Sequence, residues 1–211
     1  PEGVLIEPFL DRTKMVNNAI GTVKSNLLEG ALIVIFILVL FLGNIRAGLI
    51  VASVIPLAML FAIIMMNLFG VSGNLMSLGA LDFGLIVDGA VIIVEAVMHR
   101  LYHSRHFATV NLISQEQMNQ EVEHSAGKMM SSAVFGQIII LIVYLPILSL
   151  VGIEGKMFKP MAQTVSFALV GAFILSLTYV PMVSSLLLNK KLSHKDTWAD
   201  KMMRLLENAY Q

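Results

Sequence analysis

Long uncharged stretches alternate with short polar segments along this chain. Residues 30–45, 47–81, 129–153 and 160–189 contain no aspartate, glutamate, lysine or arginine. A helix needs roughly 20 consecutive apolar residues to cross the hydrocarbon core of a bilayer, and each of these stretches approaches or exceeds that length. The regular alternation of a membrane β-barrel is absent. The pattern therefore predicts an all-α, polytopic transmembrane helix bundle.

Short polar or glycine-containing segments divide these stretches into five expected spans. A turn is expected at residues 43–46, a break at 70–74, a polar segment at 99–128 and a loop at 152–156. The spans cover about residues 27–43, 47–69, 75–98, 132–151 and 160–188. A helix that starts near Thr13 is expected to run directly into the first span. Pro56, Pro146 and Pro181 are expected to kink their helices, as hinges for movement or only as packing features.

Three regions follow from this division. Residues 1–25 precede the bundle, residues 26–189 form the five-span bundle, and residues 190–211 follow it. Trp198, Met202 and Leu205 share one side of a helix in the last region. We therefore expect an amphipathic helix that lies on the cytoplasmic membrane surface. A linker helix packed on protein is the alternative.

Composition agrees with a membrane protein and excludes other classes. Hydrophobic residues make up 57% of the chain and charged residues 13%, with a mean hydropathy of +0.82. Soluble domains have about 25% charged residues. The formal net charge is zero, so no nucleic-acid partner is implied. The absence of cysteine excludes disulfides and thiolate metal ligands.

Basic residues predict the orientation in the membrane, because loops rich in lysine and arginine stay in the cytoplasm. Five spans place the two ends of the chain on opposite sides. The side with fewer basic residues carries Arg12, Lys14, Lys24, Lys156 and Lys159. The other side, expected to be cytoplasmic, carries Arg46, Arg100, Arg105, Lys128, Lys190, Lys191, Lys195, Lys201 and Arg204.

Three carboxylates stand out in the third expected span, which contains Asp82, Asp88 and Glu95 and no cation. An ionised side chain at the centre of a membrane helix costs about 2.5–3.5 kcal/mol. These acids must therefore be protonated, hydrated in a cavity, or paired with a group outside the chain. A low dielectric disfavours the anion, so a sheltered acid can bind and release a proton near neutral pH. This is what a proton relay requires.

The spacing of the acids supports such a relay. Asp88 and Glu95 are seven residues apart, which places them within about 20° of each other and about 10.5 Å apart along a helix. Asp82 lies roughly 120° from Asp88 on an ideal helix. Gly84 and Gly89 would let a neighbouring helix approach and shelter the acids from lipid. A purely structural hydrogen-bonding role and a sodium site remain open. An intramembrane aspartyl protease is disfavoured because all three acids share one span.

Three histidines follow the acids at the spacing of one helix face. His99, His103 and His106 stand at i, i+4 and i+7 and could bind zinc or nickel. They could equally be polar residues at the cytoplasmic end of a helix, and metal titration of a variant lacking all three would separate these interpretations. Adjacent methionines such as Met65-Met66 would suit a copper relay, but methionine is also a common apolar filler.

The acidic span resembles a known family. The stretch "DFGLIVDGAVIIVE", residues 82–95, is similar to the fourth transmembrane helix of the resistance–nodulation–division (RND) superfamily, in its heavy-metal efflux branch (the CzcA/CusA group). The stretches "DRTKMVNNAIGTVKSNLLEGA", "FLGNIRAGLIVASVIPLAML", "NLMSLGALDFG" and "GIEGKMFKPMA" also resemble that branch. The chain begins at Pro1 rather than at methionine, so we expect a segment of a longer protein.

The resemblance implies a secondary active transporter rather than an enzyme, with no cofactor. Members exchange protons for substrate across the inner membrane of Gram-negative bacteria, form homotrimers, and work with a periplasmic adaptor and an outer-membrane channel. The chain would supply spans two to six of a twelve-span protomer, and residues 1–25 would be the end of the periplasmic porter domain and its linker helix. The matching acids that carry protons would be Asp82, Asp88 and Glu95. Asn usually follows the last acid, whereas this chain has Ala96.

The residues beside the acids narrow the expected substrate. Copper and silver exporters of this branch tend to have methionines where this chain has Ile86 and Ile93, so divalent cobalt, zinc, cadmium or nickel ions are expected. Drug exporters of the superfamily usually have two adjacent aspartates where this chain has Asp88-Gly89. A drug exporter and a non-transporting membrane scaffold are the competing hypotheses.

Overall fold

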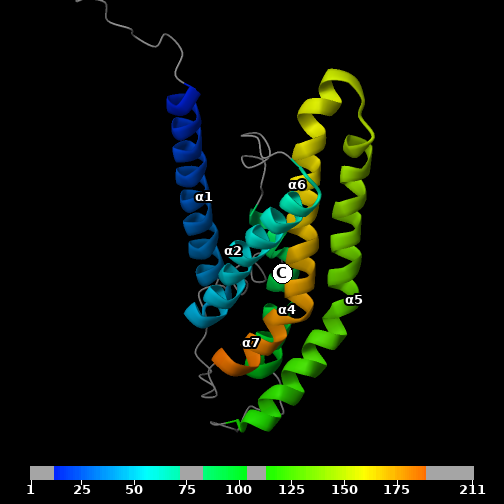
Figure 1. Cartoon of the computed structure of the whole chain (residues 1–211). Helices are drawn as coiled ribbons and strands as arrows, with labels where there is room; N and C mark the ends of the chain where they lie inside the picture. Colours follow the sequence, from blue (N-terminus) through cyan, green and yellow to red (C-terminus); the bar gives the residue numbers. More distant parts are fainter. Residues whose placement is uncertain (1–11, 72–82, 104–112, 189–211) are drawn as a thin grey trace, which may run out of the picture.

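The computed structural model describes residues 12–71, 83–103 and 113–188. Their helices are α1 (Arg12–Leu42), α2 (Ile45–Leu68), α4 (Phe83–His103), α5 (Gln115–Leu148), α6 (Gly152–Leu177) and α7 (Tyr179–Leu187) (Figure 1). No strand occurs among the described residues. The prediction of an all-α fold is confirmed.

The first two predicted boundaries are confirmed by local chemistry. Gly43 has a positive φ of 60°, which glycine adopts without strain, and it ends α1. The side chain of Asn44 then accepts hydrogen bonds from the backbone N–H groups of Arg46 and Ala47, which caps α2. Gly70, with a φ of 63°, follows the end of α2 within the predicted break. The helix expected near Thr13 is continuous with the first span, because both belong to α1.

The predicted polar segment 99–128 contains the start of α5, because this helix begins at Gln115. Ser114 and Gln117 form a capping box, in which each side chain accepts a hydrogen bond from the backbone of the other residue. The helix then continues through polar residues into the apolar stretch and ends at Leu148. The change from polar to apolar residues therefore falls within one continuous helix.

The predicted loop 152–156 and the continuous span 160–188 need correction. Helix α6 starts at Gly152, so the connection to α5 is confined to residues 149–151. The predicted span is interrupted at Thr178, where α6 gives way to α7. Pro181 explains this break, because its ring would clash with the carbonyl of Leu177 four residues earlier in a continuous helix. In the first turn of α7 its missing N–H costs nothing.

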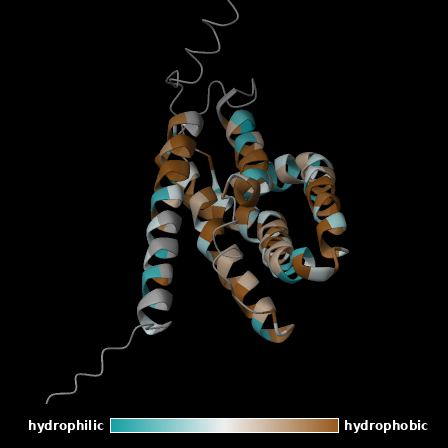
Figure 2. Ribbon diagram, turned by 90° about the horizontal axis from the view of Figure 1, so that it is seen from above, coloured by the Kyte–Doolittle hydropathy of each residue, from teal (hydrophilic) through white to brown (hydrophobic). Residues whose placement is uncertain are grey.

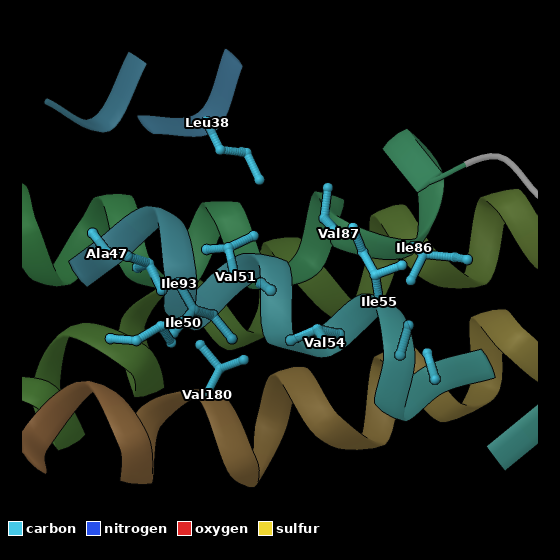
Figure 3. Close-up of a cluster of buried hydrophobic side chains, with 14 of the residues drawn as sticks. Leu38, Ala47, Ile50, Val51, Val54, Ile55, Ile86, Val87, Ile93 and Val180 are labelled. Atoms are coloured by element: carbon cyan, nitrogen blue, oxygen red, sulfur yellow. The ribbon is translucent and has the colours of Figure 1, made fainter. Parts of the chain in front are cut away.

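The helices pack into a bundle with α4 at its centre. Helix α2 makes its most extensive contact with α6, and it crosses between α1 and α6 in Figure 1. Helix α4 contacts α1, α2, α5, α6 and α7. The buried core includes Ile50, Val54, Ile86, Ile93 and Val180, which come from α2, α4 and α7 (Figure 3).

Much of the helical ribbon is coloured as hydrophobic, with hydrophilic residues interspersed (Figure 2). Large hydrophobic side chains such as Phe36, Leu60 and Ile139 are exposed on the outside of the bundle. By length and composition, α2, α5 and α6 could each cross a membrane, and α1 contains a shorter apolar stretch at Leu28–Leu40. With α4, these helices correspond to the five expected spans. The expected helix in residues 190–211 lies outside the described residues, and the boundary between residues 25 and 26 stays a prediction.

Candidate functional site

Helix α4 has one buried side, one exposed strip and half-buried positions between them. Its side toward the bundle holds Phe83, Ile86, Val87, Gly89, Ala90, Ile93, Val94, Val97 and Leu101, all of which are buried. Gly84, Asp88, Glu95 and His99 are the exposed positions, and we call them the acidic strip. They lie within about 60° of one another around the helix axis.

Asp88 and Glu95 occupy one face of α4, as their spacing predicts. Both are exposed, and neither makes a hydrogen bond or ion pair with any residue that the structure describes. We expected a neighbouring helix to shelter these acids. The five described helices that pack on α4 leave this strip open.

Contacts at the two ends of α4 fix its position in the bundle. At the start, the ring of Phe83 lies so close to α1 that a Cβ at Gly30 would come within 3.0 Å of its Cε2. At the other end, the guanidinium of Arg100 pairs with the carboxylate of Glu121 on α5. This is the one salt bridge among the described residues. These two contacts join the start of α4 to α1 and its end to α5.

Two polar residues that the sequence analysis did not select lie behind α4. Gln137 of α5 and Ser176 of α6 are both buried, and their polar atoms adjoin Gly89. The sequence does point to Gln137, because a glutamine within an expected membrane span stands out in the uncharged stretch 129–153. Its proximity to α4 depends on tertiary packing and could not be read from that stretch.

The remaining predicted site residues are only partly within the described chain. Asp82 lies outside it, and so do His106 and the side chain of His103. His99 is exposed on the acidic strip. The described residues contain no group of three or more histidines, cysteines, aspartates or glutamates that could hold a metal ion. The histidine site therefore stays a prediction.

These features define a polytopic helical membrane protein with carboxylates on its central helix, and comparison with known proteins gives its family. Residues 1–211 match the sequence model of the AcrB/AcrD/AcrF family, so the chain belongs to that family. The resemblance to the heavy-metal efflux branch of the RND superfamily is also confirmed, because the relatives described next have that character.

Three curated relatives and one solved structure show the range of similarity. The chain is 53% identical to the cobalt-zinc-cadmium resistance protein CzcA of Cupriavidus metallidurans, over 95% of the chain and 19% of that protein. It is 50% identical to the nickel and cobalt resistance protein CnrA of the same organism, over 93% and 18%. It is 30% identical to the cation efflux system protein CusA of Escherichia coli K12, over 87% and 18%.

The crystal structure of a heavy metal efflux pump superposes on this fold with a TM-score of 0.73 and 38% identity. That match covers 86% of this chain and 17% of the other. The chain thus spans about a fifth of the length of the curated relatives that it matches.

Proposed function

We propose that this chain is the proton-carrying segment of a pump that exports heavy-metal cations across the inner membrane in exchange for protons. The observation that carries the proposal is the acidic strip of α4. Two carboxylates, Asp88 and Glu95, share the exposed face of a helix whose opposite side is buried in an apolar bundle. Ionisable groups in such a setting are expensive to maintain and are functional by default.

The physical basis of the relay is the difference in hydration between a carboxylate and a neutral acid. An ionised Asp88 or Glu95 needs water or a cation, whereas the protonated form tolerates a drier environment. Protonation from the periplasm would let α4 shift against its neighbours, and release of the proton to the cytoplasm would reverse the shift. Asp88 and Glu95 are the main proposed carriers, and Asp82 is an auxiliary one.

Divalent cations are the proposed substrate class. The relatives named for cobalt, zinc, cadmium and nickel are 50–53% identical to this chain, whereas the cation efflux protein CusA is 30% identical. Ile86 and Ile93 are fully buried in the core, where their aliphatic side chains pack and offer no sulfur to a soft metal ion.

The chain covers one part of the proposed pump. The whole protein is proposed to form a homotrimer that works with a periplasmic adaptor and an outer-membrane channel in a Gram-negative bacterium. Residues 1–25 would join a periplasmic porter domain to the bundle, and residues 190–211 would lie on the cytoplasmic membrane surface.

The proposal is tested in vesicles that contain the full-length protein. Asp88→Asn and Glu95→Gln are each expected to abolish zinc transport driven by a proton gradient, and Asp82→Asn to slow it. Glu116→Gln is the matched control, because Glu116 is exposed in the first turn of α5, outside the apolar stretch. Its transport should equal that of the wild type.

Transport in vesicles and metal resistance of cells together distinguish the competing functions. Transport of organic dyes with no transport of zinc would indicate a drug exporter. A scaffold would leave metal resistance of cells unchanged when all three acids are made into amides, and that result would overturn the proposal.

A further inference from the structure

The side chain of Gln137 is buried in the bundle with its hydrogen-bonding capacity unused. It is 2% exposed, and neither its Nε2 nor its Oε1 has a hydrogen-bond partner among the described residues. A buried amide without partners is costly, because it has given up its hydrogen bonds to water. Such a group in a native protein indicates a partner that arrives as a solvent molecule or in another conformational state.

The Gln137 amide lies next to α4 at Gly89, the residue that follows Asp88. A Cβ placed on Gly89 would lie 3.3 Å from Nε2 of Gln137 and 3.2 Å from Oγ of Ser176. These distances are tighter than ordinary van der Waals contact, so a side chain at position 89 would push the amide back by a few tenths of an ångström. Ser176 already donates its hydroxyl hydrogen to the carbonyl of Ala172, at 2.8 Å, so it can only accept a further bond.

The polar atoms at this position are neutral. The charged residues of the other helices packed on α4 lie mostly near helix ends: Arg46 opens α2, residues 116–128 begin α5, residues 154–159 begin α6, and α7 carries none. Helix α1 carries Arg12 and Lys14 in its first turn, and further along it carries Lys24 and Glu29, which are both exposed. An ionised carboxylate that moved to Gln137 would meet no described cation there.

The two unpartnered atoms of Gln137 determine which kind of chemical group can bind there. Oε1 needs a donor and Nε2 needs an acceptor, side by side. A protonated carboxyl group offers both, because its O–H can donate to Oε1 while its carbonyl oxygen accepts from Nε2. An ionised carboxylate has no donor and would leave Oε1 without a bond. We propose that Gln137 is a positioning residue that binds the protonated Asp88 carboxyl as a cyclic acid–amide pair.

This inference rests on the proposed function and adds a means by which protonation of Asp88 is coupled to movement of α4. Asp88 and Gly89 are about 100° apart around the helix axis, so a part-turn of α4 would carry the Asp88 carboxyl toward Gln137. The carboxylate takes one proton from water on the open side, becomes neutral, and moves. When α4 turns back, the same proton is released to water and the Asp88 carboxylate leaves the Gln137 amide. Gln137 thereby stabilises one position of α4 in one protonation state only.

Infrared difference spectroscopy tests the proposal on the full-length protein in vesicles. Between high and low pH, the carbonyl stretch of a protonated carboxyl group should appear and should be lost in Asp88→Asn. In Gln137→Leu this band is expected to move to higher frequency, because hydrogen bonds to the carboxyl are removed. Gly89→Ala keeps the amide but fills the space in front of it, so it should move the band in the same direction.

Gln163→Leu is the matched control, since it makes the same chemical change at a half-buried position of α6 and should leave the band unmoved. If Gln137→Leu fails to accumulate, Gly89→Ala gives the same information. A band that stays in place in the variants, as it would if Gln137 held a trapped water molecule, overturns the proposal. If Asp88→Asn still stops zinc transport in that case, the proposed function stands and only the role of Gln137 is lost.

Discussion

Gly171 of α6 lies directly against the ring of Phe61 of α2. A Cβ at position 171 would come 2.6 Å from Cδ1 and 2.9 Å from Cγ of that ring. Helices α2 and α6 make the most extensive contact in the bundle, and this glycine lets them approach closely.

We therefore expect Gly171→Ala to destabilise the bundle by about 1–3 kcal/mol, the usual cost of overpacking a core. Thermal unfolding of the full-length protein in detergent measures the effect. Gly127→Ala is the control, because nothing lies within 4 Å of a Cβ at this exposed position in α5. It should be neutral or stabilising, since alanine is the better helix former. Equal melting temperatures for Gly171→Ala and wild type would contradict the close-packing account.

The boundaries predicted correctly are those set by local residues. Gly43 with Asn44, and Gly70, end and cap helices through their own backbone and side-chain chemistry. The loop predicted at residues 152–156 was wrong, because α6 already begins at Gly152. Ser114 starts α5 far outside the apolar stretch, because its capping box makes a polar sequence helical. Hydropathy predicts which residues lie in lipid, and it does not predict where a helix begins.

The acidic strip was predictable in part. Helical periodicity alone places Asp88 and Glu95 on one face. That five neighbouring helices leave this face open depends on how each helix packs, which no single stretch of sequence contains. The approach of Gln137 to Gly89 likewise joins residues on two helices, and only the folded arrangement brings them together.

The ion pair between Arg100 and Glu121 joins the end of α4 to α5. The side chains are 39% and 18% exposed, so solvent weakens their attraction, and pairs of this kind contribute about 0–1 kcal/mol. We expect Arg100→Ala to lower thermal stability slightly, and the loss to shrink in high salt. The doubly exchanged variant Arg100→Glu with Glu121→Arg should recover most of the loss. A double-mutant cycle with no coupling energy would show that the pair contributes nothing.

The short helix α7 is held at its end by side chains from two other helices. Gln115 Nε2 donates to the carbonyl of Ser185 at 2.9 Å, and Arg46 Nη1 donates to the carbonyl of Leu187 at 3.4 Å. Removing one such hydrogen bond costs about 0.5–1.5 kcal/mol. Gln115→Ala should therefore speed amide hydrogen exchange in α7, while α1, which makes no contact with α7 in the described bundle, stays unchanged. The exposed Gln120 of α5 provides the control, and Gln120→Ala should leave exchange in α7 as it is.

The exposure of the acidic strip on α4 leads to a prediction about what covers it in the complete protein. Carboxylates that faced lipid would each cost about 2.5–3.5 kcal/mol when ionised, so the strip should be covered by protein or water rather than by acyl chains. Ile92 is half-buried and flanks the strip, whereas Ile139 is 62% exposed on the outer surface of α5. Residues 1–211 contain no cysteine, so a single cysteine can be placed at either position without background from this segment.

A spin label on Ile139→Cys should collide readily with molecular oxygen, which concentrates in the hydrocarbon core. A label on Ile92→Cys in the full-length protein should show much lower oxygen accessibility, because another part of the protein or water excludes lipid there. Only labelled variants that still transport zinc are interpreted, because transport shows that the native arrangement is kept. Equal oxygen accessibility at the two positions would place the strip against lipid, and the carboxylates would then have to remain protonated throughout the cycle, which is incompatible with a relay.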